Sequence, residues 1–380
     1  MQIKKVLLVI GTRPEAIKLA PIADRFLQLS GQFQIKIVAT GQHREMLAQA
    51  IESMGLTVDV DLDVMIAGQN LATLTSSIVR GLQSQIDVWK PDLILVQGDT
   101  TSALCGALVG LYNHIKVAHV EAGLRTFNRE SPFPEEINRE LISRLADWHF
   151  APTNLAKENL VKEGIAPDRI LVSGNTVIDA LLQKLNEIEK DSELKASLEK
   201  KISNVLGNDW GSNGLVLITG HRRESFGEQF ENICLAILDL SKYFPNIKFV
   251  YPVHLNPQVQ KTVRNYLEKQ ENIYLLPPLD YEAFLYVLSK SKLVLTDSGG
   301  IQEEAPSLHK PVLVMRDNTE RPEGLTAGVM KLVGTHRNSI FEGVRDLLSS
   351  ESLYHSMTTG ENPYGDGFAA SRIVDFLATK

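Results

Sequence analysis

The sequence predicts an α/β protein built from two doubly wound parallel sheets. Three observations indicate this class. Short apolar runs alternate with longer amphipathic segments. The runs are apolar at successive positions, as strands are when both faces of their sheet are covered. The same alternation occurs in each half of a 380-residue chain, a length typical of two domains.

The first half of the chain begins with an expected strand. Its apolar run follows a basic start but is too short for the core and cleavage site of a signal peptide. Helical patterns at 15–28 and 44–54 supply the crossovers that parallel strands require. The expected strands of this half are 6–10, 35–39, 93–96 and 116–120.

The second half repeats the pattern after a boundary expected near Gly174. The stretch 185–203 is charged and favours helix, whereas 207–213 is rich in Gly and Asn and is interpreted as a loop. Helical segments are expected at 229–240, 282–289 and 369–379. The expected strands of this half are 215–219, 248–251, 272–276, 293–296 and 312–314.

Composition excludes several classes of protein. The chain has 39 Lys and Arg against 46 Asp and Glu, a formal net charge of −7, without the basic excess of a nucleic-acid-binding protein. Cys105 and Cys234 show no metal-ligand spacing and predict neither a metal site nor a disulfide framework. No apolar run approaches the roughly 20 residues of a membrane span, so we expect a cytoplasmic protein.

The segment after the run 293–296 is the strongest indication of a ligand. Ser298, Gly299 and Gly300 form a small-residue turn at an expected helix start, where free amide groups and the helix dipole favour an anion. Glu304 follows one turn later and is placed to accept hydrogen bonds from a ribose. The alternative is a turn that uses glycine only for tight packing.

Three acids of the first half are candidates for acid–base chemistry. Asp99 and Glu121 each follow an expected strand, and Glu135 begins a helix after two prolines. Asp99 has the alternative role of helix cap, and Glu135 that of a favourable first-turn residue. Glu121 follows an apolar strand, where burial without a partner is costly, so we expect it to have a partner or a function.

Basic residues also follow expected strands. His221 precedes two arginines after 215–219, and Arg13, Lys18 and Arg321 offer positive charge to a diphosphate. For Lys18 the alternative is a solvated helix face. The sequence lacks the glycine fingerprints of dinucleotide and P-loop sites, the paired histidines of zinc proteases and the G-x-S-x-G of serine hydrolases.

Long motifs in order resemble the non-hydrolysing UDP-N-acetylglucosamine 2-epimerases of bacteria, from the first strand to 362–367. The motifs are GTRPEAIK at 11–18, QHREM at 42–46, GDTT at 98–101, HVEAGLR at 119–125, PEE at 134–136, GNTVID at 174–179, GHRRE at 220–224 and SGGIQEEAP at 298–306.

This resemblance implies a glycosyltransferase-B-type fold with two Rossmann-like domains facing across a cleft, and a homodimer. The expected domains are 1–174, with the catalytic acids, and 175–366, with the UDP site; a terminal helix in 367–380 would pack back on the first. The implied reaction interconverts UDP-N-acetylglucosamine and UDP-N-acetylmannosamine, with no nicotinamide cofactor or metal, for cell-surface polysaccharide synthesis.

The resemblance also assigns residues to roles. The catalytic candidates are Asp99, Glu121, Glu135 and His221. The substrate-binding set comprises these residues except Glu135, together with Arg13, Lys18, Leu279, Phe284, Ser298, Gly299, Gly300, Glu304 and Arg321. A second UDP-N-acetylglucosamine, acting as activator, would contact Gln42, His43, Gln69, Arg222 and His254.

The chemistry suits these residue types. The hydrogen on C2 of the sugar is not adjacent to a carbonyl, so its removal must be coupled to departure of UDP from C1. That route gives 2-acetamidoglucal and needs both a diphosphate site and carboxylates. Three alternatives remain: a glycosyltransferase of the same fold, a hydrolysing epimerase that releases free N-acetylmannosamine, and a non-catalytic nucleotide-sugar sensor.

Overall fold

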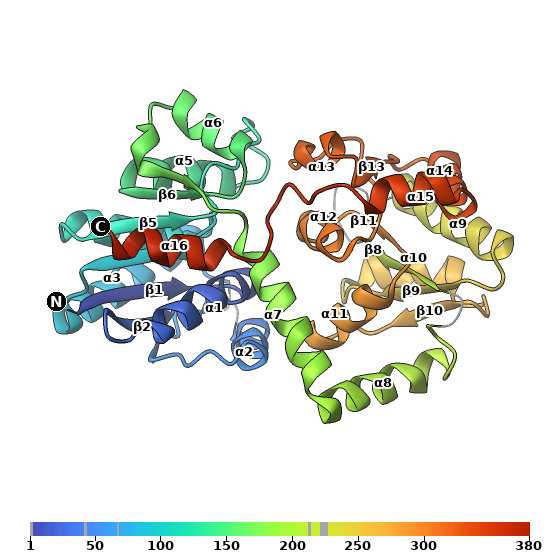
Figure 1. The fold of residues 1–380 in the computed structure, drawn as a ribbon, viewed down its shortest axis with the longest axis horizontal. Coiled ribbons are helices and arrows are strands. Elements are labelled where there is room, and N and C mark those ends of the chain that lie inside the picture. Colours follow the sequence, from blue (N-terminus) through green and yellow to red (C-terminus); the bar gives the residue numbers. More distant parts are fainter. Residues whose placement is uncertain (1–2, 42–43, 67, 212–213, 221–226) are drawn as a thin grey trace. The chain divides into compact units, whose positions relative to one another are not determined.

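The computed structural model describes residues 3–41, 44–66, 68–211, 214–220 and 227–380. These residues form two compact units, one extending to Leu182 and resuming with Tyr364–Lys380, the other comprising Gln183–Pro363. Each unit contains a parallel sheet with helices between its strands (Figure 1). The predicted α/β class with two doubly wound parallel sheets is confirmed.

The described residues of the first unit form a seven-stranded sheet in the order β3-β2-β1-β4-β5-β6-β7. Its strands are β1 (Lys4–Ile10), β2 (Phe33–Ala39), β3 (Val60–Asp61), β4 (Leu93–Gln97), β5 (Lys116–Val120), β6 (Trp148–Ala151) and β7 (Ile170–Val172). Its helices are α1 (Arg13–Gln28), α2 (Arg44–Ser53), α3 (Leu71–Trp89), α4 (Thr101–Tyr112), α5 (Glu135–Leu145), α6 (Asn154–Lys162), the 3-10 turn η1 (Pro167–Arg169), the first part of α7 (Thr176–Lys190), and α16 (Ala369–Ala378).

The order of this sheet reverses between β1 and β4, which pair in parallel with Val6 opposite Leu93. Helix α1 contacts α2 and α16, whereas α4 contacts α3 and α5. At such a reversal the two neighbouring turns diverge toward opposite faces and open a crevice at the carboxyl ends of the strands. The turns after β1 and β4 are therefore expected to border a ligand site.

The C-terminal helix α16 lies against α1 in the first unit (Figure 1). The buried carboxylate of Asp179 accepts hydrogen bonds from the backbone N–H groups of Ala369, at 3.2 Å, and Ala370, at 2.8 Å. At the other end of the helix, the Phe376 ring contacts Trp148 at a centroid distance of 5.5 Å. Asp179, part of the 174–179 motif, thus anchors the start of α16.

The described residues of the second unit form a six-stranded sheet in the order β10-β9-β8-β11-β12-β13. Its strands are β8 (Leu215–Thr219), β9 (Lys248–Pro252), β10 (Ile273–Leu276), β11 (Leu293–Thr296), β12 (Val312–Val314) and β13 (Met330–Leu332). Besides the end of α7, its helices are α8 (Ser192–Leu206), α9 (Glu228–Tyr243), α10 (Pro257–Leu267), α11 (Tyr281–Lys290), α12 (Gly299–Glu304), the 3-10 turn η3 (Ala305–Leu308), α13 (Pro322–Thr326), α14 (Arg337–Ser349) and α15 (Glu351–Thr358).

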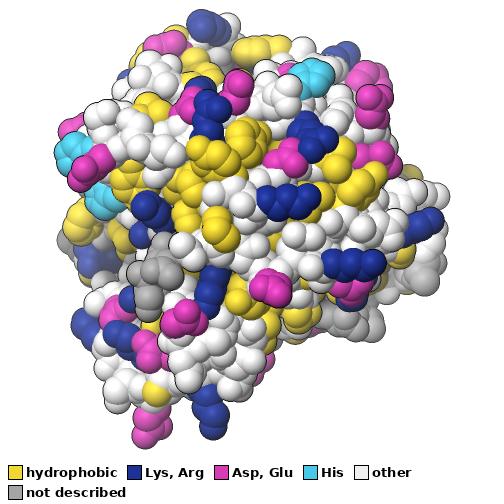
Figure 2. Space-filling view, turned by 90° about the vertical axis from the view of Figure 1, so that its right-hand side faces the viewer, with side chains coloured by type: hydrophobic (Ala, Val, Ile, Leu, Met, Phe, Trp, Pro, Cys, Tyr) yellow, Lys and Arg dark blue, Asp and Glu magenta, His cyan; other side chains and the backbone are white. Residues whose placement is uncertain are grey.

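Asp191 divides the helical stretch expected at 185–203, because its side chain accepts hydrogen bonds from the N–H groups of Glu193 and Leu194 and so begins α8. The order of the second sheet reverses between β8 and β11, which puts the turn after β11 at the corresponding crevice. On the face of the protein shown in Figure 2, charges of both signs are interspersed. No helix of the described residues is long and apolar enough to cross a bilayer.

Candidate active site

The first unit gathers its candidate residues at the carboxyl ends of β1, β4 and β5. Arg13 and Lys18 lie on α1, Asp99 follows β4 and Glu121 follows β5. Glu135 is the first residue of α5. The described contacts join Lys18 directly to Glu121, whereas Asp99 contacts another element.

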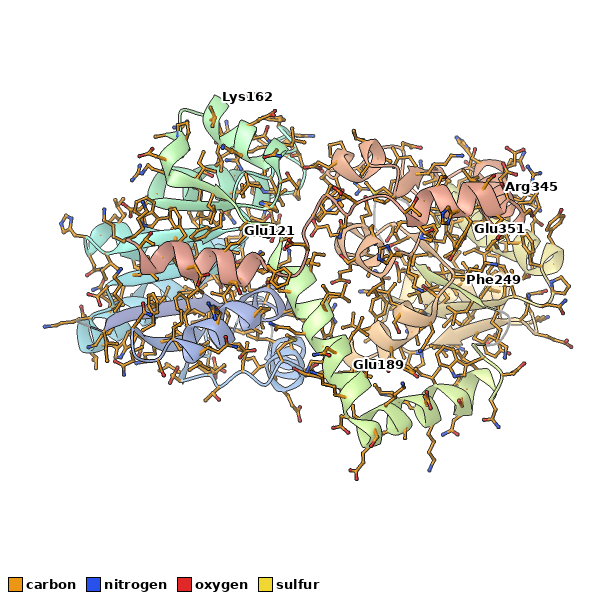
Figure 3. The ribbon with its side chains drawn as sticks, viewed as in Figure 1. Glu121, Lys162, Glu189, Phe249, Arg345 and Glu351 are labelled. Atoms are coloured by element: carbon orange, nitrogen blue, oxygen red, sulfur yellow. The ribbon has the colours of Figure 1, made fainter. Side chains whose placement is uncertain are left out.

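The carboxylate of Glu121, which is labelled in Figure 3, is buried. Both oxygens accept hydrogen bonds from the Lys18 ammonium group, at 2.7 Å (Oε1) and 2.6 Å (Oε2). Further hydrogen bonds come from the Gln97 side chain and, at 3.3 Å, from Asn175 Nδ2. Burial of a charged carboxylate would be costly without such partners.

The backbone of Glu121 is left-handed, with φ 64°. This conformation costs a non-glycine residue about 1–3 kcal/mol, and such residues are concentrated at functional sites. The left-handed residue and the charged hydrogen bonds together fix the direction of the carboxylate. A sequence pattern gives no sign of either feature.

Lys18 is not part of a solvated helix face, and that alternative is wrong. Its side chain is only 14% exposed, and its ammonium group pairs with Glu121 at 2.6 Å. The pairing favours the ionised form of the carboxylate. Arg13 differs, because its side chain is exposed at the start of the same helix.

Asp99 does not cap the helix that follows it, so that alternative is also wrong. Thr100 is the cap, since its hydroxyl accepts a hydrogen bond from the N–H of Ala103 at 3.0 Å. The Asp99 carboxylate instead forms a short ion pair with Arg139 of α5, and its side chain remains 27% exposed. Asp99 is therefore oriented by α5 and still accessible to a ligand.

The two adjacent acids at the start of α5 have different surroundings. Glu136 is fully buried, and one of its oxygens accepts hydrogen bonds from the backbone N–H groups of Thr126, at 2.9 Å, and Phe127, at 2.8 Å. Its other oxygen pairs with Arg139 at 3.0 Å. Glu135 is only half-buried. Glu136 therefore has a structural role, and Glu135 is the more accessible acid.

Sequence reasoning missed several residues that orient the candidates. Gln97 and Asn175 contact Glu121, and Arg139 contacts Asp99. His119 is hydrogen-bonded through Nε2 to the carbonyl oxygen of Gly98 at 2.7 Å. Burial lowers the pKa of His119 to about 3, so its ring is neutral and supports the Gly98 turn. Of these residues, only Asn175 and His119 lie within the long motifs of the sequence, at 174–179 and 119–125. Gln97 and Arg139 lie outside those motifs.

The second unit carries its candidates around the turn after β11. Ser298 precedes α12, and its N–H donates to the Thr296 hydroxyl at 2.9 Å. A Cβ atom on Gly299 would lie only 2.9 Å from Nη1 of Arg321. The guanidinium group of Arg321 therefore lies against the backbone of the turn, which the structure permits because residue 299 is glycine.

Two acids orient Arg321. Its Nε donates to Glu303 at 2.6 Å, and its Nη1 lies 3.7 Å from a carboxylate oxygen of Glu320. Burial by itself would raise the pKa of Glu320, but its hydrogen bond to Arg316 and the positive charges of Arg316 and Arg321 lower it to about 2. Glu320 is therefore ionised and helps to fix a cationic group at the turn.

The remaining binding candidates of the second unit are more dispersed. Gly300 is exposed beside Gly299, and Glu304 is buried at the end of α12. Leu279 and Phe284 are half-buried, the former between β10 and α11 and the latter within α11. The described contacts thus join Gly299 to Arg321, and Glu304 lies on the same helix α12 as Gly299.

Four candidates, Gln42, His43, His221 and Arg222, lie outside the described residues. Of the other expected activator contacts, Gln69 precedes α3 in the first unit, and His254 is exposed after β9 in the second. The His254 ring accepts a hydrogen bond from the N–H of Asn256 at 3.1 Å.

Comparison with known proteins identifies close relatives along the whole chain. A sequence model of the UDP-N-acetylglucosamine 2-epimerase family matches residues 25–378. The UDP-N-acetylglucosamine 2-epimerase of Yersinia pestis is 48% identical over 98% of this chain and 98% of its own length.

Two solved structures resemble the fold closely. The UDP-GlcNAc 2-epimerase of Neisseria meningitidis bound to UDP-GlcNAc superposes with a TM-score of 0.91 and 46% identity, over 99% of this chain and 100% of that one. The enzyme of Methanocaldococcus jannaschii in complex with UDP-GlcNAc and UDP gives a TM-score of 0.81 at 33% identity, with 99% and 100% coverage.

Proposed function

The chain belongs to the UDP-N-acetylglucosamine 2-epimerase family and is an isomerase of that type, and we propose that it inverts C2 by eliminating UDP and adding it back. The observation that carries this proposal is the buried carboxylate of Glu121, held by Lys18 at 2.6 Å and by a left-handed backbone. A carboxylate held in a fixed direction at the end of a strand suits proton transfer at carbon.

In the proposed elimination, Glu121 takes the proton from C2 while the bond between C1 and the diphosphate oxygen breaks. The electron pair of the C–H bond forms the C1–C2 double bond of 2-acetamidoglucal, and the pair of the C–O bond leaves with UDP. Addition reverses these changes, with a proton delivered to the opposite face of C2. We assign Asp99 and Glu135 to that delivery and to stabilising positive charge at C1.

The second unit would hold UDP throughout. We assign the diphosphate to the turn at Ser298, Gly299 and Gly300 and to Arg321, whose guanidinium group lies against that turn. Glu304 would accept hydrogen bonds from the ribose. The uridine is assigned to Leu279 and Phe284, with Arg13 and His221 as further partners of the diphosphate. The product would be UDP-N-acetylmannosamine for polysaccharide synthesis, made by a homodimer.

The test is isotope exchange in heavy water. The protein is incubated with UDP-N-acetylglucosamine and the sugar is followed by NMR. We expect deuterium at C2 and a mixture of two intact UDP-sugar epimers. Epimers without deuterium at C2 would refute the elimination, and free sugar without a UDP-sugar epimer would indicate hydrolysis.

A variant pair then tests the role of Glu121. Glu121→Gln should suppress the exchange and leave UDP binding, measured by calorimetry, largely unchanged, because the amide cannot take the proton. Glu130→Gln changes an exposed acid in the loop before α5 and should leave both unchanged. Exchange at the normal rate in Glu121→Gln would contradict the assignment.

A further inference from the structure

The turns after β1 and β4 diverge from the point where the first sheet reverses its order. The turn after β1 leads into α1, which carries Lys18, and the turn after β4 contains Asp99. Because the two helices that follow contact different neighbours, the strands do not by themselves fix the spacing of these turns. The two candidate residues need a further connection.

The side chain of Glu15 provides that connection. One oxygen, Oε2, accepts hydrogen bonds from the N–H of Gly11 at 3.0 Å and from the hydroxyl of Thr12 at 2.8 Å. The other, Oε1, accepts a hydrogen bond from the hydroxyl of Thr100 at 2.7 Å. Glu15 is 1% exposed and so spans both turns from inside the protein.

Each contact of Glu15 leads to a candidate of the active site. Thr100 directly follows Asp99 and caps α4 through Ala103. Lys18 lies three residues beyond Glu15 on α1, and its ammonium group binds Glu121. Movement of the Glu15 carboxyl group would therefore be transmitted to Asp99 through one turn and to Glu121 through the other.

The turn after β1 and the start of α4 are in close contact beside Glu15. A Cβ atom on Gly11 would lie 2.1 Å from the Ser102 hydroxyl oxygen, so the turn after β1 is pressed against the start of α4. Ser102 in turn hydrogen-bonds Thr40, after β2, at 2.8 Å. Glu15 closes this polar junction, in which no described residue forms an ion pair with the acid.

We propose that Glu15 is a positioning residue for the epimerisation, which holds the turns after β1 and β4 together and so keeps Asp99 and the Lys18–Glu121 pair in place. This inference rests on the roles proposed above for those residues. Its chemistry is hydrogen bonding rather than charge, because the groups that hydrogen-bond the carboxyl group are backbone amides and two hydroxyls.

The degree of burial agrees with this role. Desolvation raises the pKa of Glu15 to about 7, although the hydrogen bonds from Thr100, Thr12 and Gly11 act in the opposite direction. A group that is largely protonated below neutral pH can be replaced by its amide. In Glu15→Gln, the amide oxygen can accept from Gly11 and Thr12 while the NH2 group donates to Thr100.

The test compares kcat and KM of the full-length enzyme for UDP-N-acetylglucosamine. Glu15→Ala should lower kcat on the order of 10²-fold, as expected for a displaced catalytic group, while KM stays within about threefold because Glu15 hydrogen-bonds none of the described residues assigned to UDP. Glu15→Gln should restore kcat to within about threefold of the wild-type value, since it retains the hydrogen bonds.

The matched control is Asp92→Asn. Asp92 joins the same two strands at their opposite ends, where it accepts a hydrogen bond from the N–H of Lys5 at 2.8 Å. Its kcat should equal the wild-type value, with thermal unfolding recorded for every variant. If Glu15→Ala does not fold, Glu15→Asp retracts the carboxyl group by one methylene and should show the same loss of kcat.

Two results would overturn the proposal. One is wild-type kcat in Glu15→Ala or in its substitute Glu15→Asp, even with lowered thermal stability, which would make the residue merely structural. The other is a Glu15→Gln variant as slow as Glu15→Ala, which would mean that the ionised form acts. Failure of the wild-type enzyme to exchange the C2 hydrogen would instead refute the elimination itself, so the two failures are distinguishable.

Discussion

Adding one methyl group at Gly299 should weaken UDP binding through Arg321. The new Cβ atom would lie 2.9 Å from Nη1 and 3.0 Å from Cζ of the guanidinium group, closer than ordinary van der Waals contact. Arg321 cannot simply rotate away, because its Nε is bound to Glu303 at 2.6 Å. Gly299→Ala must therefore displace the cation by several tenths of an ångström or break that ion pair.

The magnitude follows from the contact that is lost. A hydrogen bond to a charged group contributes about 1.5–3 kcal/mol, and partial displacement of the guanidinium group should cost roughly half of this. A loss of about 1.4 kcal/mol is a tenfold increase in the Kd for UDP. Isothermal titration calorimetry with UDP would measure it.

A double-mutant cycle identifies the cause. If the methyl group acts through Arg321, Gly299→Ala should weaken binding about tenfold in the wild type and hardly at all in Arg321→Ala. Gly300→Ala controls only for the effect of a methyl group on folding at this helix start: apart from its chain neighbours and its own helix backbone, no atom of the described residues lies within 4 Å of its Cβ position, so it should not lower the thermal stability. Equal weakening by Gly299→Ala in both backgrounds would refute the reasoning.

Three further predictions concern the first unit. Lys18→Met should lower the free energy of unfolding, measured by urea titration, by about 3–5 kcal/mol, because the buried Glu121 loses its cation. Lys116→Met removes an exposed ion pair and should lower that free energy by less than about 1 kcal/mol. Equal losses of stability in the two variants would contradict the role given to the Lys18–Glu121 pair. Asp179→Ala should speed amide hydrogen exchange in α16 relative to α4, since two N–H groups lose their acceptor, and unchanged exchange would exclude the anchor. The pKa of Glu15 is about 7 in the folded protein, against an ordinary value of 4.5. Its contribution to the free energy of unfolding is therefore complete below pH 4.5 and falls by about 3 kcal/mol as the pH rises to 7. Urea unfolding of Glu15→Gln should lack this loss of stability with pH, and the same loss in the variant and the wild type would argue against the raised pKa.

Most strands of both sheets were predictable, and four short ones were not. The runs at 116–120, 215–219, 293–296 and 312–314 coincide with strands because burial on both faces of a sheet selects apolar residues at every position. Strands β3, β6, β7 and β13 have two to four residues each. So few residues give little pattern to recognise, and β3, β6 and β13 also contain a polar or charged residue, unlike the equally short all-aliphatic run of β12.

The sequence alone determined the α/β class and the strand ends at which Asp99, Glu121 and Ser298 lie, because burial and turn chemistry depend on local residue types. It also gave a resemblance that the relatives confirm. Tertiary structure decided the partners: Lys18 binds Glu121 across 103 residues of sequence, and Glu15 reaches Thr100 across 85. Such pairings depend on which strands lie side by side, and strand order is a property of the folded sheet that no local pattern records.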